Sequence, residues 1–147
     1  MTAYLIDTNL LLRISDGNAA THLLSISAIE RLLAQEHQLH VTGQNLIEFW
    51  SVATRPLDVN GLGWTVQQTE LTIAQLMNRF RFLDDTPNIF ANWRSLVIAY
   101  GIKGKKTHDA RLVAVMLTHS VTHLLTFNVD DFSNYAQIAL VHPSSVT

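Results

Sequence analysis

The chain has 147 residues, of which 48% are hydrophobic, and a formal net charge of -2 at pH 7. This size and apolar content predict one folded domain over residues 1–147 that needs no disulfide or structural metal to form its core. The lack of cysteine excludes thiolate nucleophiles and cysteine-bound zinc, and the slightly negative charge excludes attraction to nucleic acid through a general basic surplus.

Short apolar runs alternate with helical patterns through the first half of the chain. Each predicted strand is an apolar run, and each predicted helix has apolar residues that recur three and four positions apart. In chain order these elements are a strand over Ala3–Ile6, a helix over Ser25–Gln35, a strand ending at His40–Val41, a helix from Thr42 to about Thr54, and a helix over Val66–Met77. Thr42 is the expected N-cap of its helix, and Pro56 forces the preceding residue out of the helical region.

The same alternation continues in the second half. The predicted elements are a strand over Phe80–Leu83, a helix that ends at Gly101, a helix after Thr107 that runs to His119, a strand over His123–Phe127 and a strand over Ile138–Val141. We expect Thr86 to be the N-cap of the first of these helices, with Pro87 at its first position. Residues 112–117 make the next helix apolar nearly all round, which predicts a place in the interior.

This order of elements predicts an α/β protein whose helices cover both faces of a central sheet. The sequence contains no internal repeat, linker or low-complexity segment. No apolar run reaches about 18 residues, and no basic segment followed by an apolar one is present at the start of the chain. We therefore expect a soluble, untargeted, cytoplasmic protein that does not contact a membrane.

Acidic and amide side chains stand where predicted strands end, or on the helices that follow them. They are Asp7, Glu48, Asp109, Asn128 and Asp131. The carboxyl ends of parallel strands meet at one edge of a sheet, so we expect these side chains to gather there. Crowded carboxylates repel one another, and a divalent cation with oxygen ligands relieves that repulsion. The pattern therefore predicts a Mg²⁺ or Mn²⁺ site.

Each of these residues also has an ordinary structural explanation. Asp7 can serve as an N-cap, and Glu48 can lie on an exposed helix face. Asp109 falls in the first turn of its helix, where the dipole stabilises a carboxylate by about 0.3–1 kcal/mol with or without a metal. The sequence leaves open whether Asn128 or Asp131 completes the site.

Polar and basic residues near the acids are candidates for contacting substrate. Asn9 is expected either to hold Asp7 or to satisfy turn backbone, and Thr126 to hydrogen-bond the carboxylates from beneath. The candidates for holding a phosphate backbone are Arg13, Arg55, Lys103, Lys105 and Lys106. A solvated lysine loop is the competing explanation for the last three.

Other metal and phosphate chemistries fit the sequence less well. His119 and His123 are four residues apart, but they straddle a predicted helix end and a strand start, which argues against a zinc pair on one helical turn. A haloacid-dehalogenase-type phosphatase needs a second aspartate two residues after Asp7, where Asn9 stands. A phospho-accepting receiver domain needs paired acids near Asp7, and only one is present.

Taken together, these motifs resemble the PIN domain family and, within it, the VapC-type toxins. The similar segments are YLIDTNLLLR, TGQNLIEFWSVATRP, NGLG, THDARLVAVM and LLTFNVDDF. The resemblance implies a three-layer α/β/α fold with a parallel central sheet of four to five strands. It also implies a Mg²⁺- or Mn²⁺-dependent endoribonuclease, the toxin of a type II toxin–antitoxin pair.

The family's acids correspond to residues of this chain by position. Asp7, Glu48 and Asp109 match the first three, which implies that they hold the metal. The chain departs from the family at the fourth position, where an aspartate is common and Asn128 stands, so Asp131 is the candidate substitute. The alternative that follows is a non-catalytic PIN-like scaffold or RNA-binding protein with a degenerate metal site.

Three partners follow from the same resemblance. They are an RNA substrate, a small antitoxin that covers the acidic cleft with an arginine or an extended segment, and a second copy of the chain in a homodimer.

Overall fold

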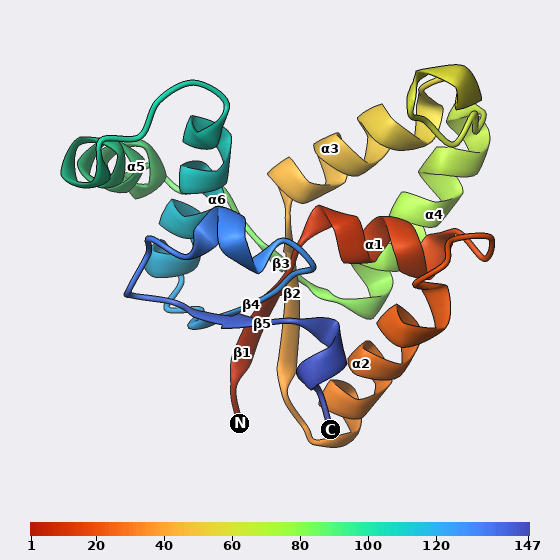
Figure 1. The fold of residues 1–147 in the computed structure, drawn as a ribbon, viewed down its shortest axis with the longest axis horizontal. Coiled ribbons are helices and arrows are strands. Elements are labelled where there is room, and N and C mark those ends of the chain that lie inside the picture. The colour runs from red at the N-terminus through yellow and green to blue at the C-terminus, as the bar shows by residue number, and fades with distance from the viewer.

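The sheet at the centre of the molecule has five parallel strands in the order β3-β2-β1-β4-β5. The structure, a computed structural model, describes residues 1–147, and its strands are β1 (Ala3–Ile6), β2 (Gln38–Thr42), β3 (Arg81–Leu83), β4 (His123–Leu125) and β5 (Ala139–Val141). The chain starts in the middle of the sheet, builds outward to β3, and returns beside β1 with β4 and β5 (Figure 1). The strand order reverses between β1 and β4, and open parallel sheets bind ligands at such a point, outside the carboxyl ends of the strands.

Six helices form a layer on each side of this sheet. One layer contains α1 (Thr8–Ser15), α2 (His22–Ala34), α3 (Gly43–Thr54) and α4 (Val66–Arg79), and the other contains α5 (Asn88–Tyr100) and α6 (Lys106–Thr118) (Figure 1). Short 3₁₀ turns lie at Leu57–Val59, Val129–Phe132 and Pro143–Ser145. The predicted three-layer α/β/α fold with a parallel sheet is confirmed. None of the helices combines the length and apolar character needed to cross a bilayer.

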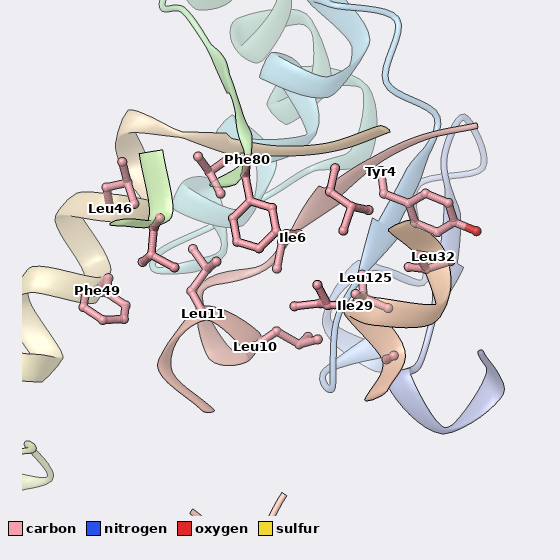
Figure 2. Close-up of a cluster of buried hydrophobic side chains, with 14 of the residues drawn as sticks. Tyr4, Ile6, Leu10, Leu11, Ile29, Leu32, Leu46, Phe49, Phe80 and Leu125 are labelled. Atoms are coloured by element: carbon pink, nitrogen blue, oxygen red, sulfur yellow. The ribbon is translucent and has the colours of Figure 1, made fainter. Parts of the chain in front are cut away.

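The larger core fills the space between the sheet and α1 to α4. Successive strand residues point to opposite faces, so Ile6 enters this core while Leu5 enters the other one. Leu10 and Leu11 of α1 and Phe49 of α3 are fully buried in it (Figure 2). Each such side chain stabilises the fold by roughly 1.5–3 kcal/mol. This burial fixes α1 directly after β1, and with it the residue between them, Asp7.

The second core lies between the sheet and the pair α5 and α6. Within α6, Ala110 and the five residues from Leu112 to Met116 are all buried. The predicted interior position of this helix is therefore confirmed. Because neighbours surround α6, its first turn is held in place above the carboxyl edge of the sheet.

The predicted elements end within three residues of the observed ones, and two expectations need correction. Thr86 is not an N-cap: α5 begins at Asn88, and Pro87 precedes it with φ -58° and ψ -23°. Those angles are already helical, so the helix starts without a side-chain cap, and the buried Thr86 hydroxyl has no hydrogen-bond partner. In addition, Thr8–Ser15 forms a helix, whereas the elements predicted from the sequence include none between Ile6 and Ser25.

The predicted stop at Gly101 is confirmed and can be tested. Gly101 ends α5 with φ 61° and ψ 41°, in the left-handed region. No atom beyond its neighbours lies within 4 Å of where a Cβ would stand, so only the backbone opposes a side chain. We expect Gly101→Ala to lower the free energy of unfolding by about 1 kcal/mol, a fall of about 2–4 °C in Tm.

Gly17→Ala is the matched control for this thermal measurement. The space around Gly17 is equally open, and its φ lies outside the left-handed region. Its Tm should stay at the wild-type value, and equal losses in both variants would contradict a backbone origin.

Candidate active site

A cleft of about 370 Å³ opens at the carboxyl edge of the sheet, where β1 and β4 end. All five residues of the predicted catalytic set line it, together with two of the predicted substrate contacts: Asp7, Glu48, Asp109, Asn128, Asp131, Asn9 and Arg55. Leu12, Val52 and Phe132 form its apolar walls, and the buried Phe132 ring anchors the loop that carries Asp131. The fold thus brings acids from four distant segments of the chain to one place.

Asp7 is the most enclosed of these acids, with only 7% of its surface exposed. Its Oδ1 accepts a hydrogen bond from the backbone N–H of Thr8 (2.8 Å), and its Oδ2 accepts one from the Thr126 hydroxyl (2.7 Å). Burial raises the pKa of Asp7, the two hydrogen bonds oppose that rise, and the charges of Glu48 and Asp131 add to it. The Thr126 hydroxyl thus makes the hydrogen bond to a carboxylate that the sequence predicted.

Thr126→Val tests how much this buried hydroxyl stabilises Asp7. Valine keeps the shape of the side chain and removes the donor to Oδ2. A buried carboxylate that loses a hydrogen bond is destabilised, so we expect the free energy of unfolding at pH 7 to fall by about 1–2 kcal/mol. Thr126→Ser, which keeps the hydroxyl, should lose less in the same denaturant titration. Equal losses would attribute the effect to packing.

Asn9 presents an acceptor that no protein group satisfies. Its Nδ2 lies 3.5 Å from both Asp7 Oδ2 and Thr126 Oγ1, while its Oδ1 is buried without a hydrogen-bond partner. A buried polar atom in that state calls for water, an ion or a ligand as its partner. Asn9 also lines the cleft, so a water or an ion held there could serve as the partner of this oxygen.

Glu48 lies on α3 and is held at both oxygens. The Thr8 hydroxyl donates to Oε2 (2.8 Å), and the Gln44 amide donates to Oε1 (3.1 Å). Asn45 in turn donates from Nδ2 to the Thr8 hydroxyl (3.1 Å) and completes a capping box with Thr42. The cap therefore fixes the first turn of α3 and also orients the side chains around Glu48.

Asp109 is half-buried in the first turn of α6, as predicted. Its pKa is raised to about 6, first by burial and then by the charges of Asp131, Asp7 and Glu48, against the opposing charge of Lys106. The like charges of three other acids reach this carboxyl. A cation in the cleft would remove that penalty.

Asn128 and Asp131 both line the cleft, although they differ in the charge they bring. The Asn128 backbone N–H donates to the Thr126 hydroxyl (3.0 Å), and its side chain is neutral. Asp131 raises the pKa of both Asp7 and Asp109. Asp131 is thus the fourth negative charge of the cleft.

The basic candidates are spread unevenly around the cleft. Arg55 lines it and directly follows the C-terminal end of α3, the helix that carries Glu48. Arg13 donates to the Asn9 backbone oxygen (3.1 Å) and stacks over Phe127. Lys106 lies 3.8 Å from Asp131, so this predicted phosphate contact pairs with an acid of the cleft.

The two other lysines of this loop, Lys103 and Lys105, are exposed and do not line the cleft.

The residue types of the cleft fit a hard divalent cation. Carboxylate and amide side chains line the cleft, Asn9 Oδ1 has no partner, and the neighbouring acids raise the pKa of Asp7 and of Asp109. No three acidic or histidine side chains converge into a ready-made metal-binding group. Mg²⁺ typically keeps several waters and takes only one or two protein carboxylates, so a dense cage is not required.

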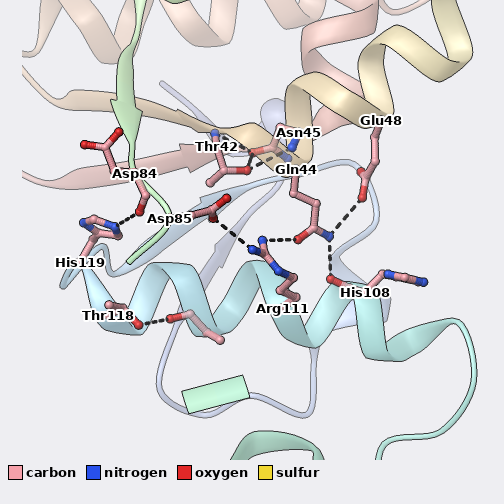
Figure 3. A network of polar contacts seen from close by, with 11 residues as sticks. Thr42, Gln44, Asn45, Glu48, Asp84, Asp85, His108, Arg111, Thr118 and His119 are labelled. Carbon is pink, nitrogen blue, oxygen red and sulfur yellow. Dashed lines mark hydrogen bonds and ion pairs between the residues drawn. The ribbon is translucent and has the colours of Figure 1, made fainter. Parts of the chain in front are cut away.

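Sequence reasoning missed one polar residue at the edge of this site, Gln44. The residue stands in the first turn of α3 and contacts both Glu48 and α6 (Figure 3). A glutamine in a helix gives no local signal of such a role, because its partners His108 and Arg111 lie more than 60 residues away.

The protein is an α/β protein with helices on both faces of a parallel sheet. Its acidic cleft lies at the carboxyl edge of the sheet, where the strand order reverses and where such proteins bind their ligands. Comparison with models of protein families assigns this α/β protein to one family. The PIN domain model matches residues 4–138, and the chain belongs to the PIN domain family. A search of curated proteins found no match.

Solved structures of low sequence identity share this fold over nearly the whole chain. VapBC-1 from nontypeable Haemophilus influenzae has a TM-score of 0.69 at 17% identity, covering 97% of this chain and 98% of that chain. A toxin-antitoxin complex from Klebsiella pneumoniae gives 0.67 at 20% identity, covering 96% and 98%. Mycobacterium tuberculosis VapC20, described as a Sarcin-Ricin loop cleaving toxin, gives 0.65 at 16% identity, covering 90% and 95%.

Proposed function

We propose that this protein is a divalent-metal-dependent endoribonuclease that hydrolyses RNA phosphodiester bonds and acts as the toxin of a type II toxin–antitoxin pair. The observation that carries the proposal is the meeting of Asp7, Glu48, Asp109 and Asp131 in one cleft, with the pKa of Asp109 raised to about 6 partly by its acidic neighbours. Four carboxylates gathered in this way fit a site whose charge is completed by a cation.

The acids have separate roles in this proposal. Asp7, Glu48 and Asp109 hold Mg²⁺ or Mn²⁺, directly or through waters that the ion keeps, and Asp131 supplies the fourth charge in place of the neutral Asn128. When bound, such an ion lowers the pKa of a water ligand and neutralises charge on the phosphoryl group in the transition state. No histidine general base is then required.

The surrounding residues hold these acids and the substrate. Thr126 and the backbone N–H of Thr8 fix the Asp7 carboxylate by bonds of 2.7 and 2.8 Å. Arg55, at the edge of the cleft, would pair with a phosphate of the RNA. Asn9 offers its unpartnered oxygen to a water or to the ion.

The relatives support the assignment of substrate and partner. One is described as a Sarcin-Ricin loop cleaving toxin, and others come from toxin–antitoxin complexes. We extend this to a small antitoxin that covers the acidic cleft with an arginine or an extended segment, to a homodimer, and to action in the cytoplasm.

Cleavage of RNA tests the proposal directly. Purified, antitoxin-free protein is incubated with a mixed pool of structured and single-stranded RNAs in Mg²⁺, in Mn²⁺ and in chelator. We expect cutting in the two metals and none in chelator. Intact RNA under all three conditions, with no metal binding in calorimetry, would favour the non-catalytic PIN-like RNA-binding or scaffold protein instead.

The lysines at the start of α6 give a separate test of RNA binding. Lys105 and Lys106 are exposed, and neutralising both as Lys105→Gln and Lys106→Gln should weaken binding uniformly across RNA sequences. Each lost phosphate contact makes the negative slope of log K against log salt shallower by about 0.7 for a single strand. Fluorescence anisotropy at several salt concentrations measures this slope. An unchanged slope would exclude these lysines as phosphate contacts.

A further inference from the structure

Two acids of the cleft lie on helices that belong to opposite layers of the fold. Glu48 is on α3, which packs in one core, and Asp109 is on α6, which packs in the other. Only two side-chain hydrogen bonds join these helices, and Gln44 takes part in both. The relative placement of the two acids therefore depends on this one side chain more than on any other polar contact.

The Gln44 amide nitrogen donates hydrogen bonds both to a side chain of α3 and to the backbone of α6. Nε2 donates to Glu48 Oε1 (3.1 Å) and to the backbone oxygen of His108 (2.8 Å) (Figure 3). His108 directly precedes Asp109 in the first turn of α6. One amide group thus connects the Glu48 carboxylate to the backbone that carries Asp109.

The orientation of this amide is set by a charged pair. Arg111 Nη1 donates to Gln44 Oε1 (3.2 Å), and Arg111 Nη2 donates to Asp85 Oδ1 (3.1 Å) (Figure 3). A flipped amide would turn its oxygen toward two acceptors and its NH₂ toward a guanidinium that only donates. Arg111, held by Asp85, therefore keeps Nε2 directed at Glu48.

Gln44 and Thr8 each hold one oxygen of the Glu48 carboxylate. The Thr8 hydroxyl holds Oε2 (2.8 Å), next to Asp7, and Gln44 holds Oε1, on the side of α6. Without Gln44 the carboxylate would keep only its bond to Thr8. It would then be free to rotate relative to Asp109.

We propose that Gln44 is a positioning residue that sets the place of Glu48 relative to Asp109, and that Arg111 acts through it by fixing its amide. The inference rests on the proposed function, because it assigns Gln44 a part in preparing these acids for a divalent cation. Loss of hydrogen-bonding partners of metal-binding side chains typically weakens metal binding about 10–100-fold.

Calorimetric titration of metal-free protein with Mn²⁺ tests this role without any assay of activity. Gln44→Met keeps the length of the side chain and removes its donor and acceptor groups, and we expect the Kd for Mn²⁺ to rise about 10-fold or more. The control is Gln75→Met on α4, an exposed residue without a side-chain hydrogen bond, whose Kd should match the wild type. Circular dichroism confirms that each variant is folded at the titration temperature.

The outcomes separate the two proposals. If the wild type binds Mn²⁺ and Gln44→Met binds it with the same Kd, the positioning role is wrong and the proposed function stands. If the wild type binds no Mn²⁺, the proposed function fails and the role of Gln44 fails with it. A purely structural contribution of Gln44 would lower Tm and leave the Kd of the folded protein unchanged.

The part assigned to Arg111 has its own signature. Arg111→Met should weaken Mn²⁺ binding in the wild-type background, and the double variant with Gln44→Met should bind no more weakly than Gln44→Met alone. An arginine that acted only by its charge would repel the cation, so its loss would tighten binding in both backgrounds. Tighter binding, or additive weakening in the double variant, would overturn the role of Arg111.

Discussion

Asp7→Asn is expected to reduce metal-dependent RNA cleavage by about 1,000-fold or more. The change removes one of the proposed metal ligands, and loss of about 4 kcal/mol of transition-state stabilisation corresponds to roughly that factor. Asparagine is also a good N-cap, so α1 should still begin at Thr8. Initial rates on a labelled RNA in Mg²⁺ and in Mn²⁺ measure the loss, and circular dichroism measures the fold.

Asp58→Asn is the control for removing one negative charge. Asp58 lies in the exposed 3₁₀ turn Leu57–Val59, outside the cleft. Its cleavage rate should equal that of the wild type. Full activity in Asp7→Asn would exclude Asp7 from the reaction, whereas equal losses in both variants would indicate a general effect of charge.

Asp109→Asn is expected to abolish cleavage and, at the same time, to stabilise the metal-free protein. The pKa of Asp109 is about 6 in the folded chain, above its usual value of about 3.9 in an unfolded one. Between those pH values the folded state binds more protons than the unfolded state. The free energy of unfolding therefore falls as the pH rises through this window, and the whole penalty is present at pH 7.

The asparagine variant lacks this penalty. Asp109 is half-exposed, and solvent screening reduces the effect, so we expect a gain of about 1 kcal/mol at pH 7, or about 2–4 °C in Tm. At pH 4 the two proteins should have nearly the same Tm. Thermal melts in chelator from pH 4 to 7 make the comparison, and a variant less stable than the wild type at pH 7 would contradict the assigned repulsion.

Added Mn²⁺ should reverse the order of stability. A ligand that binds only the folded state stabilises it, and the wild type keeps all the proposed ligands. The same melts in excess Mn²⁺ should therefore raise the Tm of the wild type above that of Asp109→Asn.

Much of the fold could be predicted because the apolar runs and capping residues of the sequence stand where the strands and helices of the structure begin. The strand Ala3–Ile6 and the helix starting after Thr42 follow from an apolar run and a capping residue. The helix α1 was missed because its eight residues leave only two turns in which a helical pattern can show, although Leu10, Leu11 and Ile14 share one buried face. The Thr86 cap failed because Pro87 is already in a helical conformation.

The acids of the cleft could also be predicted, since strand ends meet at one edge of a parallel sheet. The contacts that side chains of the cleft make with distant segments of the chain could not be predicted. One of them is the pairing of Lys106 with Asp131, whose charged atoms lie 3.8 Å apart. Gln44 gave no signal because its contacts depend on how α3 and α6 meet above the sheet. Pairings of this kind are properties of the folded chain and leave no local pattern.

A crystal of the protein soaked in Mn²⁺ tests the proposed metal site most directly, with anomalous scattering used to locate the ion. We expect a peak inside the cleft, among the oxygens of Asp7, Glu48 and Asp109. This peak should disappear in Asp7→Asn. An empty cleft in a crystal with full access to Mn²⁺, or a peak elsewhere on the chain, would contradict the proposed metal-dependent nuclease.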